Sequence, residues 1–240
     1  MIKNFFSFKI LSLNNKFLLN LTILMIVILS VGIIYALFIS PPDFVQGQSV
    51  RIMYVHVPSS FIALGIFGFI GLASICDLIF KIKFTSLMAK SLALVGLIFN
   101  LISIVTGSLW GKPTWGVWWA WDARLTSMLI LLIFYIAYIL SWKLIKNYDL
   151  ANKISSIIGI IGSFNLPIIK YSVDWWNTLH QPSSITLTSA PTIHHSMLVP
   201  LIIMIVGLLL YSLIIFLMKY KTELIKLKFS KKSNFLLRSF

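Results

Sequence analysis

Six long apolar runs constrain the fold of this chain more than any other feature. Each is close to the ~20 residues that an α-helix needs to cross a membrane. The runs lie at 18–39, 59–80, 88–109, 125–142, 154–170 and 197–218. Because lipid offers the backbone no hydrogen-bond partner and the alternating pattern of a β-barrel is absent, the runs predict transmembrane helices. The fifth is the shortest and contains Asn165 and Pro167, so its limits are the hardest to predict.

The composition agrees with this fold class. Hydrophobic residues make up 59% of the chain, charged residues 11%, and the mean hydropathy is +0.96, far outside the range of soluble proteins. We therefore predict an all-α integral membrane protein with six transmembrane helices in a single domain, residues 1–240. The net charge of +14 does not indicate nucleic-acid binding, because the basic residues lie in short segments between the apolar runs.

The distribution of Lys and Arg predicts the orientation in the membrane. Sixteen of the 20 fall on one side when the runs alternate in direction, so the positive-inside rule puts both termini in the cytoplasm. Segments 40–58, 110–124 and 171–196 then face outward and contain all four histidines and seven of the eight tryptophans. Function is expected on this outer face. The basic tail, 219–240, is expected at the cytoplasmic membrane surface.

Three residues exclude or disfavour other kinds of protein. Cys76 is the single cysteine, which excludes an intramolecular disulfide and covalent cofactor attachment at a Cys-x-x-Cys-His motif. Asp77 and Lys170 are predicted near the ends of their spans, and no acid or base is predicted at mid-membrane. An ion-coupled transporter usually needs an ionisable residue at that depth, so this pattern argues against one.

A dense tryptophan stretch, residues 110–126, separates the third and fourth runs. It holds five tryptophans within twelve positions and continues into an Asp/Arg pair. Trp115, Trp118, Trp119 and Asp122 follow the i, i+3, i+4, i+7 rule, which predicts a short interfacial helix on the outer leaflet with these side chains on one face. A period of two also fits part of the stretch, and its two glycines weaken the helix prediction.

These indoles have two interpretations. They can lodge among lipid headgroups as an aromatic belt, or they can stack against a flat ligand. A belt explains one or two indoles at a helix end. It does not predict five in one loop that ends in Trp121, Asp122 and Arg124. Ligand stacking is therefore the favoured interpretation, with membrane lipid around the remaining indoles.

His56 and His180 lie in two other segments predicted to face outward. A neutral imidazole there can be an axial iron ligand, and two from different loops could hold a haem whose edge the indoles cover. Each can equally be a hydrogen-bonding histidine of the membrane interface. A four-coordinate zinc site is disfavoured, because no Cys or further carboxylate lies at ligand-like spacing. The adjacent His194 and His195 cannot easily face one ligand and are interpreted as loop residues.

Arg51 and Arg124 are two of only four basic residues predicted on the outer side. A guanidinium suits a bidentate grip on a carboxylate, and haem propionates are carboxylates. The alternatives are contact with lipid headgroups or, for Arg124, a local pair with Asp122.

A longer motif begins at Trp110 and reads Trp-Gly-x-x-x-Trp-Gly-x-Trp-Trp-x-Trp-Asp-x-Arg-Leu-Thr. It resembles the signature of the WWD haem-handling membrane proteins, most closely the CcmC family of cytochrome c maturation. The segments around His56 and His180, the length and the six-span layout also look like this family, so the resemblance covers nearly the whole chain. It implies haem b held non-covalently on the outer face. The implied residues are His56 and His180 as axial ligands, Trp115, Trp118, Trp119, Trp121 and Asp122 as the platform, and Arg51 and Arg124 at the propionates.

The resemblance also implies partners. The haem would pass to the periplasmic haem chaperone CcmE, the ABC transporter CcmA–CcmB would release the loaded chaperone, and the small subunit CcmD would accompany them. The protein would then be a loading scaffold rather than an enzyme, in a bacterial cytoplasmic membrane or a mitochondrial inner membrane.

Two functions of other classes remain open. The alternative is a b-type cytochrome-like membrane subunit that passes electrons to quinone. Such proteins usually place haem-ligating histidines inside their helices, whereas no predicted span here contains one. A permease with an aromatic outer gate is a third interpretation, and the absence of predicted charges at mid-membrane argues against it.

Overall fold

The computed structural model describes residues 14–180 and 190–237, so the last three residues of the predicted basic tail, 238–240, lie outside the described residues. The described part consists of helices and connecting segments, with one isolated β-bridge between Asp43 and Gly47. Within these described residues, six helical stretches are long and apolar enough to cross a membrane, which confirms the predicted fold class. In chain order the elements are α2 (Asn15–Ile34), the π-turn η1 (Tyr35–Ile39), the 3₁₀ turn η2 (Gln48–Ile52), α3 (Met53–Phe80), α4 (Lys83–Trp115), α5 (Ala123–Leu144), α6 (Tyr148–Ser163), α7 (Asn165–Trp175) and α8 (His195–Leu237).

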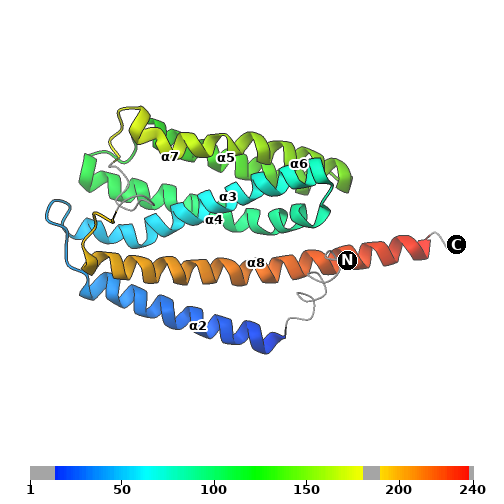
Figure 1. Cartoon of the computed structure of the whole chain (residues 1–240), viewed down its shortest axis with the longest axis horizontal. Coiled ribbons are helices and arrows are strands. Elements are labelled where there is room, and N and C mark those ends of the chain that lie inside the picture. The colour runs from blue at the N-terminus through cyan, green and yellow to red at the C-terminus, as the bar shows by residue number, and fades with distance from the viewer. Residues whose placement is uncertain (1–13, 181–189, 238–240) are drawn as a thin grey trace.

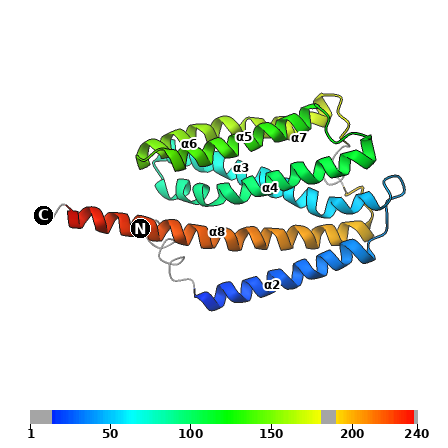
Figure 2. The same ribbon diagram turned by 180° about the vertical axis from the view of Figure 1, so that it is seen from behind.

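The helices run side by side, with α3 and α4 in the middle of the bundle (Figure 1). α5, α6 and α7 cover one side of this pair, and α8 covers the other. α2 lies outermost and packs mainly against α8, as the view from behind also shows (Figure 2). The central core is aromatic: the rings of Phe67 and Tyr135 meet edge to face at 4.8 Å, and the Tyr135 hydroxyl donates to the carbonyl of Ala63 at 2.6 Å.

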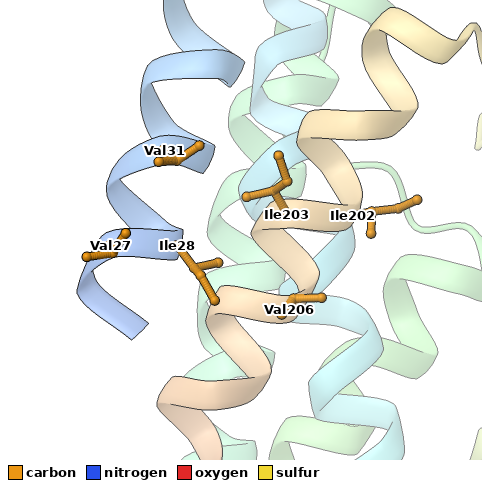
Figure 3. Close-up of a pocket in the computed structure, with 6 residues that line it drawn as sticks. All are labelled: Val27, Ile28, Val31, Ile202, Ile203 and Val206. Atoms are coloured by element: carbon orange, nitrogen blue, oxygen red, sulfur yellow. The ribbon is translucent and has the colours of Figure 1, made fainter. Parts of the chain in front are cut away.

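A shallow groove of about 330 Å³ lies between α2 and α8 (Figure 3). Its lining comes from α2 and α8 alone: Val27, Ile28, Val31, Ile202, Ile203 and Val206. These aliphatic side chains offer no hydrogen-bonding or metal-binding atom, so the groove is not a candidate for a polar ligand site. The residues that the sequence marks as candidates for a site lie instead at one end of the bundle.

We call that end the tryptophan end. It comprises the described segments 40–52, 110–124, 175–180 and 190–195, which gather at the left of Figure 1. The opposite end holds the short connections between α3 and α4 and between α5 and α6. These are the segments that the lysine count predicts to be cytoplasmic.

The second span begins earlier than its hydropathy suggests. η2 and α3 start at Gln48 and Met53, so Pro58 lies inside α3 rather than at its start. His56 is therefore a helical residue near one end of α3, and the prediction that it lies in a loop before the helix is wrong. Hydropathy falls over this segment, yet polar side chains are accommodated because α4 supplies partners: Ser60 and Ser103 form a hydroxyl–hydroxyl hydrogen bond of 2.5 Å.

The predicted interfacial helix in the tryptophan stretch is also wrong. α4 continues through Pro113 and ends at Trp115, where Gly116 takes a left-handed conformation (φ 78°) and donates to the carbonyl of Lys112 at 3.1 Å. A left-handed residue stops a helix, and glycine adopts it without steric cost. Residues 116–122 are non-helical. Trp118, Trp119 and Asp122 therefore do not share a helical face with Trp115.

The fifth run forms two helices, α6 and α7, that meet at Phe164. Pro167 has no N–H to donate to the carbonyl four residues earlier, which favours a break at this point. Asn165 ties the break to α5 by donating to the carbonyl of Ser127 at 2.8 Å. The sequence marks the limits of this run as the hardest to predict, and the structure divides the run at Phe164.

The last helix is far longer than its predicted span. α8 continues without interruption to Leu237, so the described part of the basic tail is helical. Within it, Glu223 pairs with Lys90 of α4 at 2.6 Å and with Lys226 at 2.8 Å. The first pair connects α8 to α4 near the end opposite the tryptophans.

Candidate functional site

His56 packs against one face of α4. Its Nδ1 lies 3.1 Å from the hydroxyl of Thr106, and its ring meets the ring of Trp110 edge to face at 5.7 Å. Gly107 leaves the space that the imidazole occupies, because a Cβ there would lie 2.9 Å from Cε1 of His56. Thr106 thus positions the imidazole by a hydrogen bond and Trp110 by an aromatic contact, while Gly107 leaves room for the ring.

His180 lies just beyond α7 and is positioned by α5 and α4. Nη1 of Arg124 is 3.1 Å from Nδ1 of His180, and the ring of Trp115 lies 6.0 Å from the imidazole. The other guanidinium nitrogens of Arg124 bind α7: Nε donates to the Ser172 hydroxyl and Nη2 to the Lys170 carbonyl, each at 3.2 Å. Arg124 therefore joins α5 to α7 and to the segment that carries His180.

The two histidine clusters lie at neighbouring turns of α4. Trp110 and Trp115 are five residues apart on that helix, which corresponds to roughly 7.5 Å along its axis. His56 lies within the range of electrostatic interaction with His180 and Arg124. The structure thus brings together two histidines and an arginine that are distant in sequence.

The rest of the tryptophan stretch folds back over the end of α4. The Ser108 hydroxyl donates to the carbonyl of Trp118 at 2.7 Å, and the ammonium group of Lys112 lies 5.9 Å from the centre of the Trp118 ring. Trp119 and Trp121 meet edge to face at 5.7 Å. Trp118 and Trp121 are exposed, whereas Trp119 is half-buried. The indoles therefore present several orientations rather than one continuous stacking face.

Asp122 has a clear local role. It caps the start of α5, where its Oδ1 accepts from the backbone N–H of Leu125 at 2.8 Å. This contact replaces the Asp122–Arg124 pair considered from the sequence. Its second oxygen, Oδ2, is buried without a hydrogen-bond partner, as are Nε1 of Trp119 and Nε of Arg51. Buried polar atoms normally have partners, so the unpartnered atoms of Asp122 and Trp119 fit a site that receives a polar ligand.

Arg51 contacts the outer loop. It belongs to η2, and its Nη2 donates to the carbonyl of Ser40 at 3.1 Å. Trp110 is bound to the same outer segment, because its Nε1 donates to the side chain of Gln46 at 2.9 Å. Arg51 thus holds the loop between η1 and η2, and its described contact is with that loop rather than with His56 or His180.

His194 and His195 stand at the start of α8. Both are exposed, their rings are 6.3 Å apart, and His194 contacts the hydroxyl of Ser196 at 2.8 Å. The described contacts of their side chains are with each other and with Ser196. They offer natural controls for the two histidines of the site.

Thr106, Gly107 and Ser172 were not identified as site residues from the sequence. Thr106 and Gly107 come one helical turn before Trp110, so the helical spacing of α4 could have indicated their common face. Ser172 carries no such signal, because its role depends on how α7 packs against α5. Trp110 was recognised as part of the stretch but was not assigned to the site.

Fold and site together define a polytopic helical membrane protein with a tryptophan-rich site at one end, in which two histidines and an arginine meet. The chain matches the family described as heme exporter protein C, CcmC, over residues 4–234, and it belongs to that family. This confirms the resemblance seen in the tryptophan motif and gives the chain a haem-handling role in cytochrome c maturation.

Several relatives cover most of the chain. Heme exporter protein C of Haemophilus influenzae is 42% identical over 203 residues, which are 85% of this chain and 82% of that protein. The protein of the same name from Escherichia coli K12 is 42% identical over 201 residues, covering 84% and 81%. A relative from Marchantia polymorpha, named as a ccmC-like mitochondrial protein of cytochrome c biosynthesis, is 38% identical over 205 residues, covering 85% and 87%.

Proposed function

We propose that this protein binds haem b non-covalently at the tryptophan end and delivers it to the haem chaperone CcmE. The observation that carries the proposal is the pair of histidine clusters on α4, with His56 on Thr106 and Trp110, and His180 on Trp115 and Arg124. Two imidazoles supplied by separate elements suit the axial positions of one iron. Family membership supports haem as the cargo.

The remaining predicted residues take supporting roles. Trp115, whose ring lies beside His180, and the half-buried Trp119 are the indoles best placed to cover the porphyrin. Exposed Trp118 and Trp121 suit contact with lipid or an incoming partner. Asp122 acts mainly as a helix cap beneath this platform. Arg124 is the stronger candidate for a propionate, because it already contacts His180. Arg51 reaches a propionate only if the ligand extends toward η2.

A haem-retention experiment tests the ligands. The protein is produced in cells that lack the chaperone, purified in detergent and examined by its optical spectrum. His56→Ala and His180→Ala should each lose most of the haem or change its coordination. His194→Ala and His195→Ala, which alter exposed histidines at the same end, should leave the spectrum unchanged. Absence of haem from the unsubstituted protein, or unchanged haem in both site variants, would defeat the assignment.

Delivery requires a second measurement. Haem-loaded protein is mixed with haem-free CcmE, and the haem on each protein is followed after separation. Transfer that is faster than spontaneous haem loss supports delivery, whereas transfer at the rate of spontaneous loss would limit the protein to binding. Assembly with CcmA–CcmB and CcmD is tested by co-purification from cells that produce all four proteins.

The proposed orientation places the tryptophan end on the periplasmic side of a bacterial cytoplasmic membrane, with both termini in the cytoplasm. A mitochondrial inner membrane is the alternative location. Because Cys76 is the single cysteine, a Cys76→Ser background allows new cysteines to be labelled one at a time. A cysteine at Val117 should react with a membrane-impermeant reagent from outside, and labelling from the cytoplasm alone would reverse the orientation.

An electron-transfer subunit remains the second candidate, and one observation favours it. His56 lies within α3, and b-type cytochromes commonly ligate haem from helices. His180, however, follows α7 in a non-helical segment. Stoichiometric quinone reduction by the haem-loaded protein would favour electron transfer, whereas haem transfer to CcmE without it favours the delivery proposal.

A further inference from the structure

Thr106 determines which ring nitrogen of His56 carries the proton. The Thr106 hydroxyl oxygen lies 2.6 Å from the carbonyl oxygen of Ile102 and 3.1 Å from Nδ1 of His56. Two oxygens this close need a proton between them, and the hydroxyl has only one. The hydroxyl therefore accepts at His56, so Nδ1 carries the proton and donates it, while Nε2 keeps its lone pair. A metal-binding Nε2 requires this tautomer.

Arg124 imposes the opposite tautomer on His180. A guanidinium donates hydrogen bonds and accepts none, so Nδ1 of His180, 3.1 Å from Nη1 of Arg124, must be the acceptor. The ring is then neutral with its proton on Nε2. Arg124 occupies the lone pair of Nδ1, and Nε2 carries a hydrogen. In this arrangement His180 offers no lone pair to a metal.

We infer that the two histidines are unequal ligands: Thr106 presents His56 ready to bind iron, whereas Arg124 restrains His180 until their hydrogen bond breaks. The inference rests on the proposed function, which supplies the haem. Iron binding at Nε2 of His180 requires the proton to move to Nδ1, and an N–H there cannot accept from Arg124. Iron binding at Nδ1 would use the lone pair that Arg124 occupies. Either way, the Arg124–His180 hydrogen bond and the iron–His180 bond exclude each other.

The exchange is balanced and local. One N–H···N hydrogen bond breaks, one iron–nitrogen bond forms, and the ring proton moves between its two nitrogens through water, to which the half-buried His180 has access. No net proton or electron is gained or lost. Nη1 of Arg124 becomes available to a carboxylate such as a propionate, while Nε and Nη2 can keep their contacts with Ser172 and Lys170. His180 is then the ligand that binds second and leaves first, which suits a protein that must release its cargo.

Haem-free protein provides the first test. Histidine labelled with ¹⁵N reports the protonation of each ring nitrogen by NMR, and single His→Ala variants assign the four signals. We expect Nδ1–H on His56, and on His180 an excess of the Nε2–H form of about tenfold or more, because its partner is charged. Arg124→Leu should reduce the excess of the Nε2–H form at His180 alone. Thr106→Val should weaken the Nδ1–H preference at His56, and Thr106→Ser, which keeps the hydroxyl, should restore it. The same tautomer in both rings would overturn the inference.

Haem-loaded protein provides the second test. In the unsubstituted protein, the electron paramagnetic resonance g-values of the low-spin ferric iron should be those of two neutral imidazole ligands. The g-values of an imidazolate ligand would show that Arg124 stays bonded to a deprotonated His180 ring, and would overturn the inference. If the unsubstituted protein binds no haem, the proposed function fails, yet the tautomers of the haem-free protein remain measurable and are judged separately.

Discussion

Gly107 is the position where one added methyl group should disturb the site without unfolding the protein. A Cβ there would lie 2.9 Å from Cε1 of His56 and 3.4 Å from its Nδ1. Carbon atoms in favourable contact are about 3.5–4.0 Å apart, so the imidazole must move by about 0.6–1.1 Å. The ring is the end of a side chain that can rotate, so the backbones of α3 and α4 can stay in place.

A displacement of this size matters for binding more than for stability. Binding groups must be held within about 0.5 Å of the productive geometry. The movement also separates His56 from Thr106, and loss of such a partner typically lowers metal affinity 10–100-fold. We expect Gly107→Ala to weaken haem binding by about 10–100-fold, or about 1.4–2.7 kcal/mol. The free energy of unfolding should change by less than about 1 kcal/mol, because alanine's better helix propensity offsets the crowding.

The assay is a titration of ferric haem into detergent-purified protein, followed by its optical spectrum, with thermal unfolding measured in parallel. Gly65→Ala is the matched control, because a Cβ at that helical glycine would meet nothing within 4 Å. It should bind haem like the unsubstituted protein. Unchanged affinity and spectrum in a folded Gly107→Ala variant would refute the reasoning, and an equal loss in Gly65→Ala would show that any added methyl group in the helices has this effect.

Three further substitutions test the packing that supports the site. Gly96→Ala would place a Cβ 2.5 Å from Cε1 of buried Tyr135, so the free energy of unfolding should fall by about 1–3 kcal/mol. A melting temperature at or above that of the unsubstituted protein would contradict this packing. Asp122→Ala removes the cap of α5 and should lower the free energy of unfolding by about 1 kcal/mol, whereas Asp122→Asn keeps a capping oxygen and should lower it less. Equal losses of stability in thermal unfolding would argue against the capping role. Asn152→Ala removes the amide that donates to buried Asp77 and should lower the free energy of unfolding by about 1–3 kcal/mol, measured by denaturant unfolding in detergent. An unchanged free energy of unfolding would mean that this carboxylate is solvated in another way.

The six spans could be predicted because each depends on a local requirement. An apolar run in lipid must satisfy its own backbone, so length and hydropathy suffice to predict a helix. Helix limits depend on neighbours instead. His56 and Thr106 are polar, but each finds its partner across the α3–α4 contact, so α3 begins well before the hydropathy rises.

The tryptophan stretch shows the limit of periodicity. Trp115, Trp118, Trp119 and Asp122 have helical spacing, yet the left-handed Gly116 ends the helix before three of them. A spacing rule counts side chains and does not register one residue whose backbone departs from the helical region.

The residue types of the site were evident from the sequence, but their pairing was not. Histidine, tryptophan and arginine in outer segments predict a site for a flat, acidic ligand. Arg124 and His180, however, are 56 positions apart and meet only because α7 packs against α5. The opposite tautomers of His56 and His180 depend on which atom of Thr106 and Arg124 lies next to each ring. That information exists only in three dimensions.

The length of α8 connects the two ends of the molecule mechanically. At 43 residues and 1.5 Å per residue it is about 65 Å long, roughly twice the ~30 Å of a hydrocarbon core. Near its start, Met197 packs in the same apolar cluster as Trp110, whose ring meets His56, and much farther along Glu223 pairs with Lys90. A stiff rod of this length that tilts by about 5° about its middle shifts each end by roughly 3 Å. A tilt of α8 caused at its lysine-rich part would therefore displace Met197 and, through Trp110, the imidazole of His56.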